Sequence, residues 1–324
     1  SAVSSPTASR SSSLTEPRAA VKLEGYLGKG RHPAESNDGR TDVYKFNYST
    51  ETFSSSVSGT MPIQKKFPGA ASNSTRGYWA SGTPGNSSIV DKFVWSTNTG
   101  STIPATMSSA RGYAQSAAGN ETQGYFAFGN PGASNQETCD KLTYSSETMS
   151  TLPAMPMKSA SAVAVSMQTA GYFGSGAGQD DKASYFCKIT FASDTKSSAI
   201  PGWRSPGGGA VAGRAASSSP TKAYITGGES QGNSMDVTTW ATNSTSLQPT
   251  SFMPNNSSYI AGQGGHENGY FTGGPSTSST QRMVYASDTI SVLPGANFPG
   301  GVFDAYSAGG PGMNGAGTAT PNTI

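Results

Sequence analysis

Short stretches of apolar and small residues alternate with polar ones along the whole chain, and one arrangement of them returns six times. Each copy starts with a tyrosine in a run of aromatic and small residues that ends in glycine. The six tyrosines are Tyr26, Tyr78, Tyr125, Tyr172, Tyr224 and Tyr270. They are 52, 47, 47, 52 and 46 positions apart. A period of about 50 residues is typical of a propeller array.

Each copy predicts four short β-strands. The first is the tyrosine strand, and the second carries an aromatic residue with, in five copies, a basic residue three places before it. These pairs are Lys45 and Tyr48, Lys92 and Trp95, Lys141 and Tyr144, Lys188 and Phe191, Arg282 and Tyr285, with Val237 and Trp240 in the fifth copy. A short polar turn follows, and then a third strand that closes on proline, as at Pro104 and Pro153. The fourth strand is expected before the next tyrosine, as in 111–119 or 159–167.

The pattern shows no helical period, so we predict an all-β fold, a six-bladed β-propeller of four-stranded antiparallel blades. Glycines inside the tyrosine strands agree with this fold, because inner strands crowd together near a propeller axis. We expect one domain over residues 21–309. Residues 1–20 form a Ser-rich N-terminal arm, and residues 310–324 form a Gly/Thr-rich C-terminal tail.

Alignment of the two chain ends predicts how the ring closes. Residues 302–308 align with 112–118, so the C-terminus supplies one extra copy of the fourth strand. Residues 11–16 are a degenerate copy that competes for the same place, and we favour the C-terminal copy as the strand that completes the first blade. A seven-bladed ring is the alternative, but residues 1–10 are too few to supply the missing strands.

The order of these signals resembles the kelch repeat over roughly residues 20–309. The double glycine of that repeat is intact at Gly227-Gly228 and at Gly273-Gly274 and is reduced to one glycine in the other copies. The usual tryptophan near the last strand is missing. The resemblance implies a kelch-like propeller and no particular activity, because one propeller fold serves many functions.

The distribution of charged residues does not favour any class of binding partner. The chain has 21 basic and 19 acidic residues and a net charge of +2, and the charges are scattered, so we expect no nucleic-acid partner. We also expect no membrane insertion, since no apolar run approaches the roughly 20 residues that span a bilayer. The given sequence has no signal-peptide pattern and no starting methionine, and we expect a processed chain or a fragment of a longer one.

Candidate chemistry is sparse. His32 and His266 are the only histidines and have no metal-ligand spacing, so we predict a protein that is not an enzyme and has no metal or other cofactor. Asp180 and Asp181 could contact Ca²⁺, although ordinary turn residues explain them better. We expect two buried thiols at Cys139 and Cys187 in preference to a bridge.

Residues that the repeat does not explain are the candidate binding residues. Trp203 and Arg204 stand in an insertion, 201–206, that the other copies lack. Two interpretations remain open for Trp203: an exposed ring that binds a partner or stacks on a sugar, or packing within its own loop. The other candidates, Arg31, His32 and Arg40, belong to the long loop 29–41.

Loops rich in Ser, Thr, Asn and Gly favour a binding role for the chain. The sequence of its repeat resembles the repeat arrays in structural and tail-fibre proteins of marine bacterial viruses, including cyanophages. We therefore expect a non-enzymatic virion or extracellular protein, a tail-fibre or surface component that binds a host glycan or another structural subunit and forms an oligomer. The alternatives are a secreted lectin or adhesin, with Asn73-Ser74-Thr75 and Asn120-Glu121-Thr122 as glycosylation sites, and a propeller enzyme.

Overall fold

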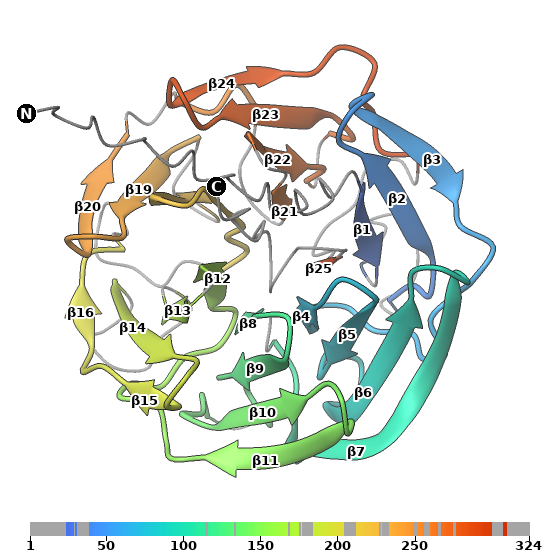
Figure 1. Ribbon diagram of the computed structural model, residues 1–324, viewed down its shortest axis with the longest axis vertical. Coiled ribbons are helices and arrows are strands. Elements are labelled where there is room, and N and C mark those ends of the chain that lie inside the picture. The colour runs from blue at the N-terminus through green and yellow to red at the C-terminus, as the bar shows by residue number, and fades with distance from the viewer. Residues whose placement is uncertain are drawn as a thin grey trace, which may run out of the picture.

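Six antiparallel β-sheets stand around a central axis in the computed structural model (Figure 1). The structure describes residues 24–28, 30, 39–113, 116–132, 134–167, 169–174, 176, 184–203, 212–226, 228, 233–248, 252–255, 260–264, 267–274 and 277–299, and the backbone of 307–309. All regular elements within these ranges are β-strands, which confirms the all-β prediction. None of these ranges holds a helix that is long and apolar enough to span a membrane.

The blades follow one another in chain order, and each starts with its innermost strand except the first. From the axis outward the strands of blades 1 to 3 are β25 (Ser307–Gly309), β1 (Glu24–Gly28), β2 (Val43–Asn47) and β3 (Thr52–Ser56); β4 (Gly69–Ser72), β5 (Arg76–Ala80), β6 (Ser87–Val94) and β7 (Thr99–Arg111); β8 (Ser116–Gly119), β9 (Gln123–Ala127), β10 (Cys139–Thr143) and β11 (Thr148–Leu152).

Blades 4 to 6 repeat this order. Their strands are β12 (Val163–Met167), β13 (Ala170–Gly174), β14 (Tyr185–Thr190) and the two outer pieces β15 (Thr195–Lys196) and β16 (Ile200–Pro201); β17 (Ala216–Ser218), β18 (Lys222–Thr226), β19 (Met235–Thr239) and β20 (Ser244–Leu247); β21 (Ala261–Gly264), β22 (Asn268–Thr272), β23 (Thr280–Val284) and β24 (Thr289–Val292). The ring therefore has six blades, and the seven-blade alternative is wrong.

Burial falls from the axis to the rim, and the sequence follows it. The inner strands β4, β8, β17 and β21 consist of small residues and one glutamine and are buried throughout. Outer strands such as β11 and β20 are Ser- and Thr-rich and mostly exposed. Small residues are required at the axis because inner strands of neighbouring blades approach one another there; an added Cβ on Gly262 of β21 would lie 2.3 Å from the carbonyl oxygen of Ala216 in β17.

The C-terminal strand closes the ring. β25 pairs antiparallel with β1 through Tyr26 and Gly309, Leu27 and Ala308, and Gly28 and Ser307. The prediction that a C-terminal copy completes the first blade is therefore confirmed for these residues. The remainder of that copy, 302–306, and the competing N-terminal copy, 11–16, lie outside the described residues, as do the arm and the tail.

Two strand boundaries differ from the predicted ones. The strands expected over 111–119 and 159–167, which are the innermost strands of blades 3 and 4, begin later, at Ser116 and Val163. The outer strand of blade 2, which was expected to close on Pro104, does not stop there, since β7 runs on to Arg111. Pro104 is tolerated because β7 is an edge strand and its pairing with β6 is irregular between the pairs Asp91–Thr102 and Ile89–Thr106.

The repeated aromatic residues join neighbouring blades. Counted outward from the axis, the second strand of each blade carries the repeated tyrosine. The ring of this tyrosine packs against the aromatic residue that directly follows the third strand of the next blade. The pairs and their centroid distances are Tyr26–Trp95 4.4 Å, Tyr78–Tyr144 5.0 Å, Tyr125–Phe191 5.1 Å, Tyr172–Trp240 4.4 Å, Tyr224–Tyr285 5.3 Å and Tyr270–Tyr48 5.4 Å. Because the last pair joins blade 6 to blade 1, the six contacts close on themselves.

A polar contact that we call a latch accompanies the aromatic pair at five of the six boundaries. Its acceptor is the third residue of the turn between the third and outer strands, always with φ between 51° and 56°. The residues at this turn position are Glu51, Asn98, Glu147, Asp194, Asn243 and Asp288. The tyrosine of the preceding blade donates its hydroxyl to five of them, over distances of 2.5 to 3.2 Å.

A basic residue of the preceding blade joins the tyrosine wherever the acceptor is a carboxylate. Lys92 binds Glu147, Lys141 binds Asp194, and Arg282 binds Glu51. In blade 5, where Val237 replaces the basic residue, Lys222 of the adjacent strand binds Asp288 instead. The basic residue of the basic-x-x-aromatic pattern therefore contacts the next blade in three copies, whereas its aromatic residue contacts the preceding blade.

The boundary between blades 1 and 2 lacks this latch. The turn residue here is Asn98, and the two blade 1 donors bind Glu24 on their own blade, the Tyr26 hydroxyl at 3.2 Å and the Lys45 ammonium at 3.0 Å. Within the part of the chain that the structure describes, Oδ1 of Asn98 is buried without a donor. This boundary depends on its aromatic stack more than the others do.

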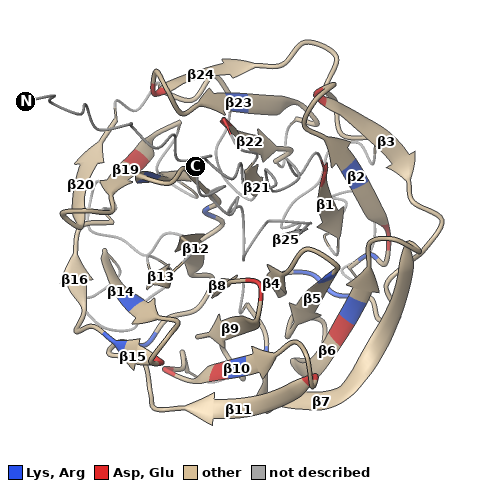
Figure 2. Cartoon of the chain, viewed as in Figure 1, with Lys and Arg blue, Asp and Glu red and all other residues tan. Residues whose placement is uncertain are grey.

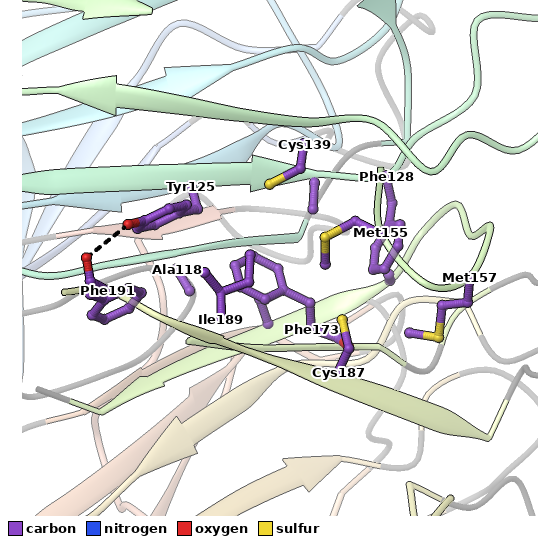
Figure 3. Packing of buried hydrophobic residues seen from close by; sticks show 13 residues of the cluster. Ala118, Tyr125, Phe128, Cys139, Met155, Met157, Phe173, Cys187, Ile189 and Phe191 are labelled. Carbon is purple, nitrogen blue, oxygen red and sulfur yellow. Dashed lines mark hydrogen bonds between the residues drawn. The ribbon is translucent and has the colours of Figure 1, made fainter. Parts of the chain in front are cut away.

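Hydrophobic residues fill the spaces between blades. Figure 3 shows the cluster between blades 3 and 4, where Phe173 and Ile189 of blade 4 pack beneath Tyr125 and Cys139 of blade 3. The Tyr125 hydroxyl also reaches the carbonyl oxygen of Phe191 across this boundary, at 3.4 Å. The core is thus a ring of inter-blade clusters.

Candidate binding face

The two faces of the ring carry different connections. One face, which we call the turn face, holds the turns that link first to second and third to outer strands, including the five latch turns. The other, which we call the connection face, holds the segments between second and third strands and those that lead from one blade to the next. By their positions in the chain, all predicted binding residues belong to segments of the connection face.

The structure agrees with neither interpretation of Trp203. Its side chain is fully buried, and its ring stacks on Phe186 with a centroid distance of 5.0 Å. Its indole Nε1 donates to the hydroxyl of Thr238 at 2.9 Å, which joins blade 4 to blade 5. The ring is therefore not exposed. It packs against strands of blades 4 and 5, which differs both from an exposed binding ring and from packing within its own loop.

Arg40 is the other predicted binding residue that the structure describes. Its guanidinium Nε lies 3.1 Å from the carboxylate of Asp42, and its backbone forms a bridge with Lys65. Arg40 precedes β2 in blade 1 whereas Trp203 follows β16 in blade 4, so the two residues belong to opposite sides of the ring. Arg31, His32, Arg204, Asp180 and Asp181 lie outside the described residues.

The connection face is held together between blades 1 and 4 by isolated backbone bridges. The first and fourth bridges join the loop after a tyrosine strand to the segment that enters the next blade, and the second and third join such a loop to the segment that enters its own blade. The bridged pairs are Arg40 and Lys65, Lys66 and Thr83, Gly112 and Asn130, and Gln136 and Ser159. These bridges give the loops a fixed backbone, so side chains on them are held at defined positions.

Lys65, which forms the first of these bridges, has a buried side chain. Its side chain is 8% exposed, and its ammonium donates to the carbonyl oxygen of Pro84 at 3.3 Å. Burial lowers the pKa of Lys65, and the nearby carboxylate of Asp91 opposes that shift. A buried lysine that bonds a loop carbonyl serves to fix the loop.

Tyr113 is the exposed aromatic residue of the connection face. Its side chain is 42% exposed, and Phe67 backs its ring with centroids 5.1 Å apart. Both residues have left-handed backbones, with φ of 50° at Tyr113 and 57° at Phe67. For bulky side chains this conformation costs about 1–2 kcal/mol per residue and occurs often at functional sites.

Backbone contacts hold Tyr113 in that conformation. Its carbonyl oxygen accepts from the amide of Ser161 at 2.7 Å, and the preceding Gly112 exchanges two hydrogen bonds of 2.9 Å with Asn130. An added Cβ on Gly112 would lie 2.6 Å from both Asn86 Oδ1 and Thr83 Cγ2. The segment that presents Tyr113 is therefore clamped between blades 2, 3 and 4.

Amide side chains gather beside this segment. Asn86 lies against Gly112, Asn130 Nδ2 donates to Asn135 Oδ1 at 3.3 Å, and Asn130 Oδ1 accepts from the amide of Gly132 at 2.6 Å. Thr83 is 8% exposed, and its hydroxyl has no hydrogen-bond partner in the described part of the chain. The result is a neutral array of donors and acceptors next to an exposed ring.

Charged groups elsewhere in the described residues serve the scaffold. Arg111 and Asp140 form a fully buried pair at 2.6 Å, and Arg214 and Asp236 form another at 2.5 Å. Figure 2 shows basic and acidic residues spread around the ring, with no blade of a single sign. The described residues include no group of three or more His, Cys, Asp or Glu side chains placed to hold a metal ion.

The two cysteines behave as the sequence predicts. Cys139 and Cys187 are free thiols, fully buried in the cluster between blades 3 and 4 (Figure 3). Burial raises the pKa of Cys139 to about 12 and also raises the pKa of Cys187. Neither thiol is available as a nucleophile in the folded protein.

Both possible glycosylation sequences form turns of the turn face. Oδ1 of Asn73 accepts from the amide and hydroxyl of Thr75, each at 3.0 Å. Oδ1 of Asn120 accepts in the same way from Thr122, at 2.9 Å for both bonds. These asparagines and threonines thus have a structural reason to occur together, because they close the hairpin between first and second strands.

Sequence reasoning missed Tyr113. It placed Arg111 to Gly119 in one strand, and in a strand Tyr113 would be an ordinary packing residue. The sequence around it gives no distinguishing signal, because Arg111-Gly112-Tyr113 has the same residues as Arg76-Gly77-Tyr78, the start of a buried tyrosine strand. Comparison with known proteins adds no identification, since no protein-family model and no curated protein matches the chain.

Proposed function

We propose that this chain is a non-enzymatic structural and adhesion protein, a kelch-like propeller that works as a tail-fibre or surface component of a virion or as an extracellular protein. Its connection face binds a host glycan or another structural subunit, and the propeller is one part of a larger assembly. The resemblance of its repeat wording to tail-fibre arrays supports the viral setting.

The difference between the two faces is the observation that carries this proposal. The turn face holds short turns, five of which engage a polar side chain in a latch between blades. The connection face carries the longer segments, a clamped backbone and the exposed ring of Tyr113. A rigid scaffold that presents loops on one face is a common arrangement for recognition.

The non-enzymatic part of the proposal has its own support. The latch carboxylates Glu51, Glu147, Asp194 and Asp288 and the buried Asp140 and Asp236 are each bound by a lysine or arginine. Groups held in this way stabilise blades and are not poised for proton transfer.

Site-directed blocking of one face tests the proposal. Because both native thiols are buried, a cysteine placed on the surface can be labelled selectively with a maleimide polymer. Pro131 on the connection face and Ser145 on the turn face are both exposed and both belong to blade 3. Pro131→Cys and Ser145→Cys therefore form a matched pair.

Binding of the labelled full chain to marine bacterial cells, including cyanobacteria, is measured before and after periodate oxidation of the cell-surface glycan. We expect the polymer at position 131 to abolish binding and the polymer at 145 to leave it unchanged. Equal binding by both labelled variants, or no binding of the wild-type chain to cells or to virion components, would refute the proposal. Loss of binding after periodate identifies glycan as the ligand.

A further inference from the structure

We infer that Tyr113, with the amide side chains next to it, forms a subsite for a neutral sugar ring. This inference rests on the proposed function, because it names the ligand that the connection face takes and the residue that stacks on it.

The first argument is the presentation of the ring. Among the described residues, Tyr113 is the one aromatic side chain that is well exposed, whereas the repeated tyrosines are buried between blades. Phe67 packs against its ring, with centroids 5.1 Å apart and ring planes tilted by 31°, and Tyr113 is still 42% exposed. A backed, immobile ring loses little conformational entropy when a ligand stacks on it.

The second argument is the chemistry around the ring. The segments 112–113 and 128–132 contain no charged residue, and the neighbouring Lys65, Lys66 and Arg111 are buried, with Lys65 bonded to the Pro84 carbonyl and Arg111 to Asp140. Nearby polar groups are the amides of Asn86 and Asn130 and backbone groups, which can donate to and accept from hydroxyl groups. The hydroxyl of Thr83 is buried there without a partner among the described residues. This set suits a ligand with many hydroxyl groups and no charge.

The third argument separates a sugar from a protein partner. The other well-exposed large apolar side chains among the described residues are Leu247 and Val292, on the outer strands β20 and β24 of blades 5 and 6. Tyr113 belongs to the segment that enters blade 3, and the aromatic ring that packs against it, Phe67, is buried. The centre of a protein interface requires a contiguous apolar patch, which these residues do not form.

Replacement of Tyr113 can be made without a penalty from the backbone. Tyr113→Gly removes the ring and suits the φ of 50°, so the variant is expected to fold with an unchanged or higher melting temperature. Tyr113→Phe keeps the ring and loses only the hydroxyl. Leu247→Ala, which removes an exposed side chain far from blade 3, is the matched control.

The probes are the methyl glycosides of glucose, galactose, mannose and N-acetylglucosamine and their short oligomers. Binding to the full chain is measured by saturation-transfer NMR and by calorimetry. At least one of these neutral sugars is expected to bind the wild-type chain, with affinity reduced about tenfold or more by Tyr113→Gly and changed less than about threefold by Tyr113→Phe. Leu247→Ala is expected to bind as the wild type does.

Absence of binding by every sugar, or equal binding by wild type and Tyr113→Gly, would overturn the inference. Dissociation of an oligomer by Tyr113→Gly would also overturn it, since Tyr113 would then contact a protein subunit. The proposed function fails separately: if the polymer at position 131 still blocks cell binding while no neutral sugar binds, the connection face remains the binding face and only the sugar subsite is wrong.

Discussion

The latch at Glu147 allows the inter-blade contacts to be tested quantitatively. Its carboxylate accepts from Arg76 at 2.9 Å, from the Tyr78 hydroxyl at 3.1 Å and from the Lys92 ammonium at 2.9 and 3.1 Å. All three donors belong to blade 2, and Glu147 belongs to blade 3. Glu147→Gln keeps the shape of the side chain and its turn, and it removes the charge that these donors share.

The expected loss follows from the geometry. A hydrogen bond to a charged group contributes about 1.5–3 kcal/mol, but the Glu147 side chain is 21% exposed, so solvent screens part of this, and glutamine keeps one acceptor. We expect Glu147→Gln to lower the free energy of unfolding by about 2 kcal/mol. For a chain of this size that corresponds to a melting temperature about 3 °C lower.

The same latch predicts a pH dependence. Burial by itself would raise the pKa of Glu147, but its hydrogen bonds to Lys92, Tyr78 and Arg76 and the charge of Lys92 outweigh burial and hold the pKa below its ordinary value of 4.5. A carboxylate whose pKa is lowered by folding stabilises the fold above its unfolded pKa, and that stabilisation is lost as the pH falls through its folded pKa. The difference between wild type and Glu147→Gln should be full at neutral pH and should shrink below about pH 4.5.

Urea denaturation followed by tryptophan fluorescence, at neutral pH and at about pH 3.5, measures both effects. Glu137→Gln is the matched control, because Glu137 also belongs to blade 3 but its only described ion pair, with Lys158, is 3.8 Å long and about half exposed. That variant should stay within about 0.5 kcal/mol of wild type. If Glu147→Gln were as stable as its control, or if its deficit were the same at both pH values, the latch would not stabilise the ring as described.

Three further predictions concern closure, a buried pair and the thiols. Truncation after residue 301 removes β25, exposes the edge of β1 and should lower the melting temperature by roughly 5 °C or more; an unchanged value would contradict closure by this strand. Arg111→Met should cost about 3–5 kcal/mol by leaving Asp140 charged and unpaired, and the double variant with Asp140→Leu should recover most of it; equal stability of wild type and the single variant would argue against the pair. Cys139 and Cys187 should resist a thiol reagent at mildly alkaline pH and react fully in denaturant, and rapid labelling of the native protein would show that they are accessible.

The sequence by itself determined the number of blades, their four strands and the strand that closes the ring. These follow from a period near 50 residues and from alternation within each strand, which depend on local order along the chain and are readable without coordinates. It also predicted that the repeated aromatic and basic residues belong to the scaffold, and that Cys139 and Cys187 are buried thiols.

Only the tertiary structure decided which blade each repeated residue serves. The phrase that joins Lys141 to Tyr144 is local in sequence, yet Lys141 binds Asp194 of the next blade, and Tyr144 stacks on Tyr78 of the preceding one. Likewise the insertion at Trp203 is buried, whereas Tyr113, which the pattern assigned to a strand, is exposed. The physical reason is that strand periodicity fixes which residues share a face of one sheet, while the partner of that face, and the surface left over, depend on how neighbouring blades and their connections pack when the ring closes.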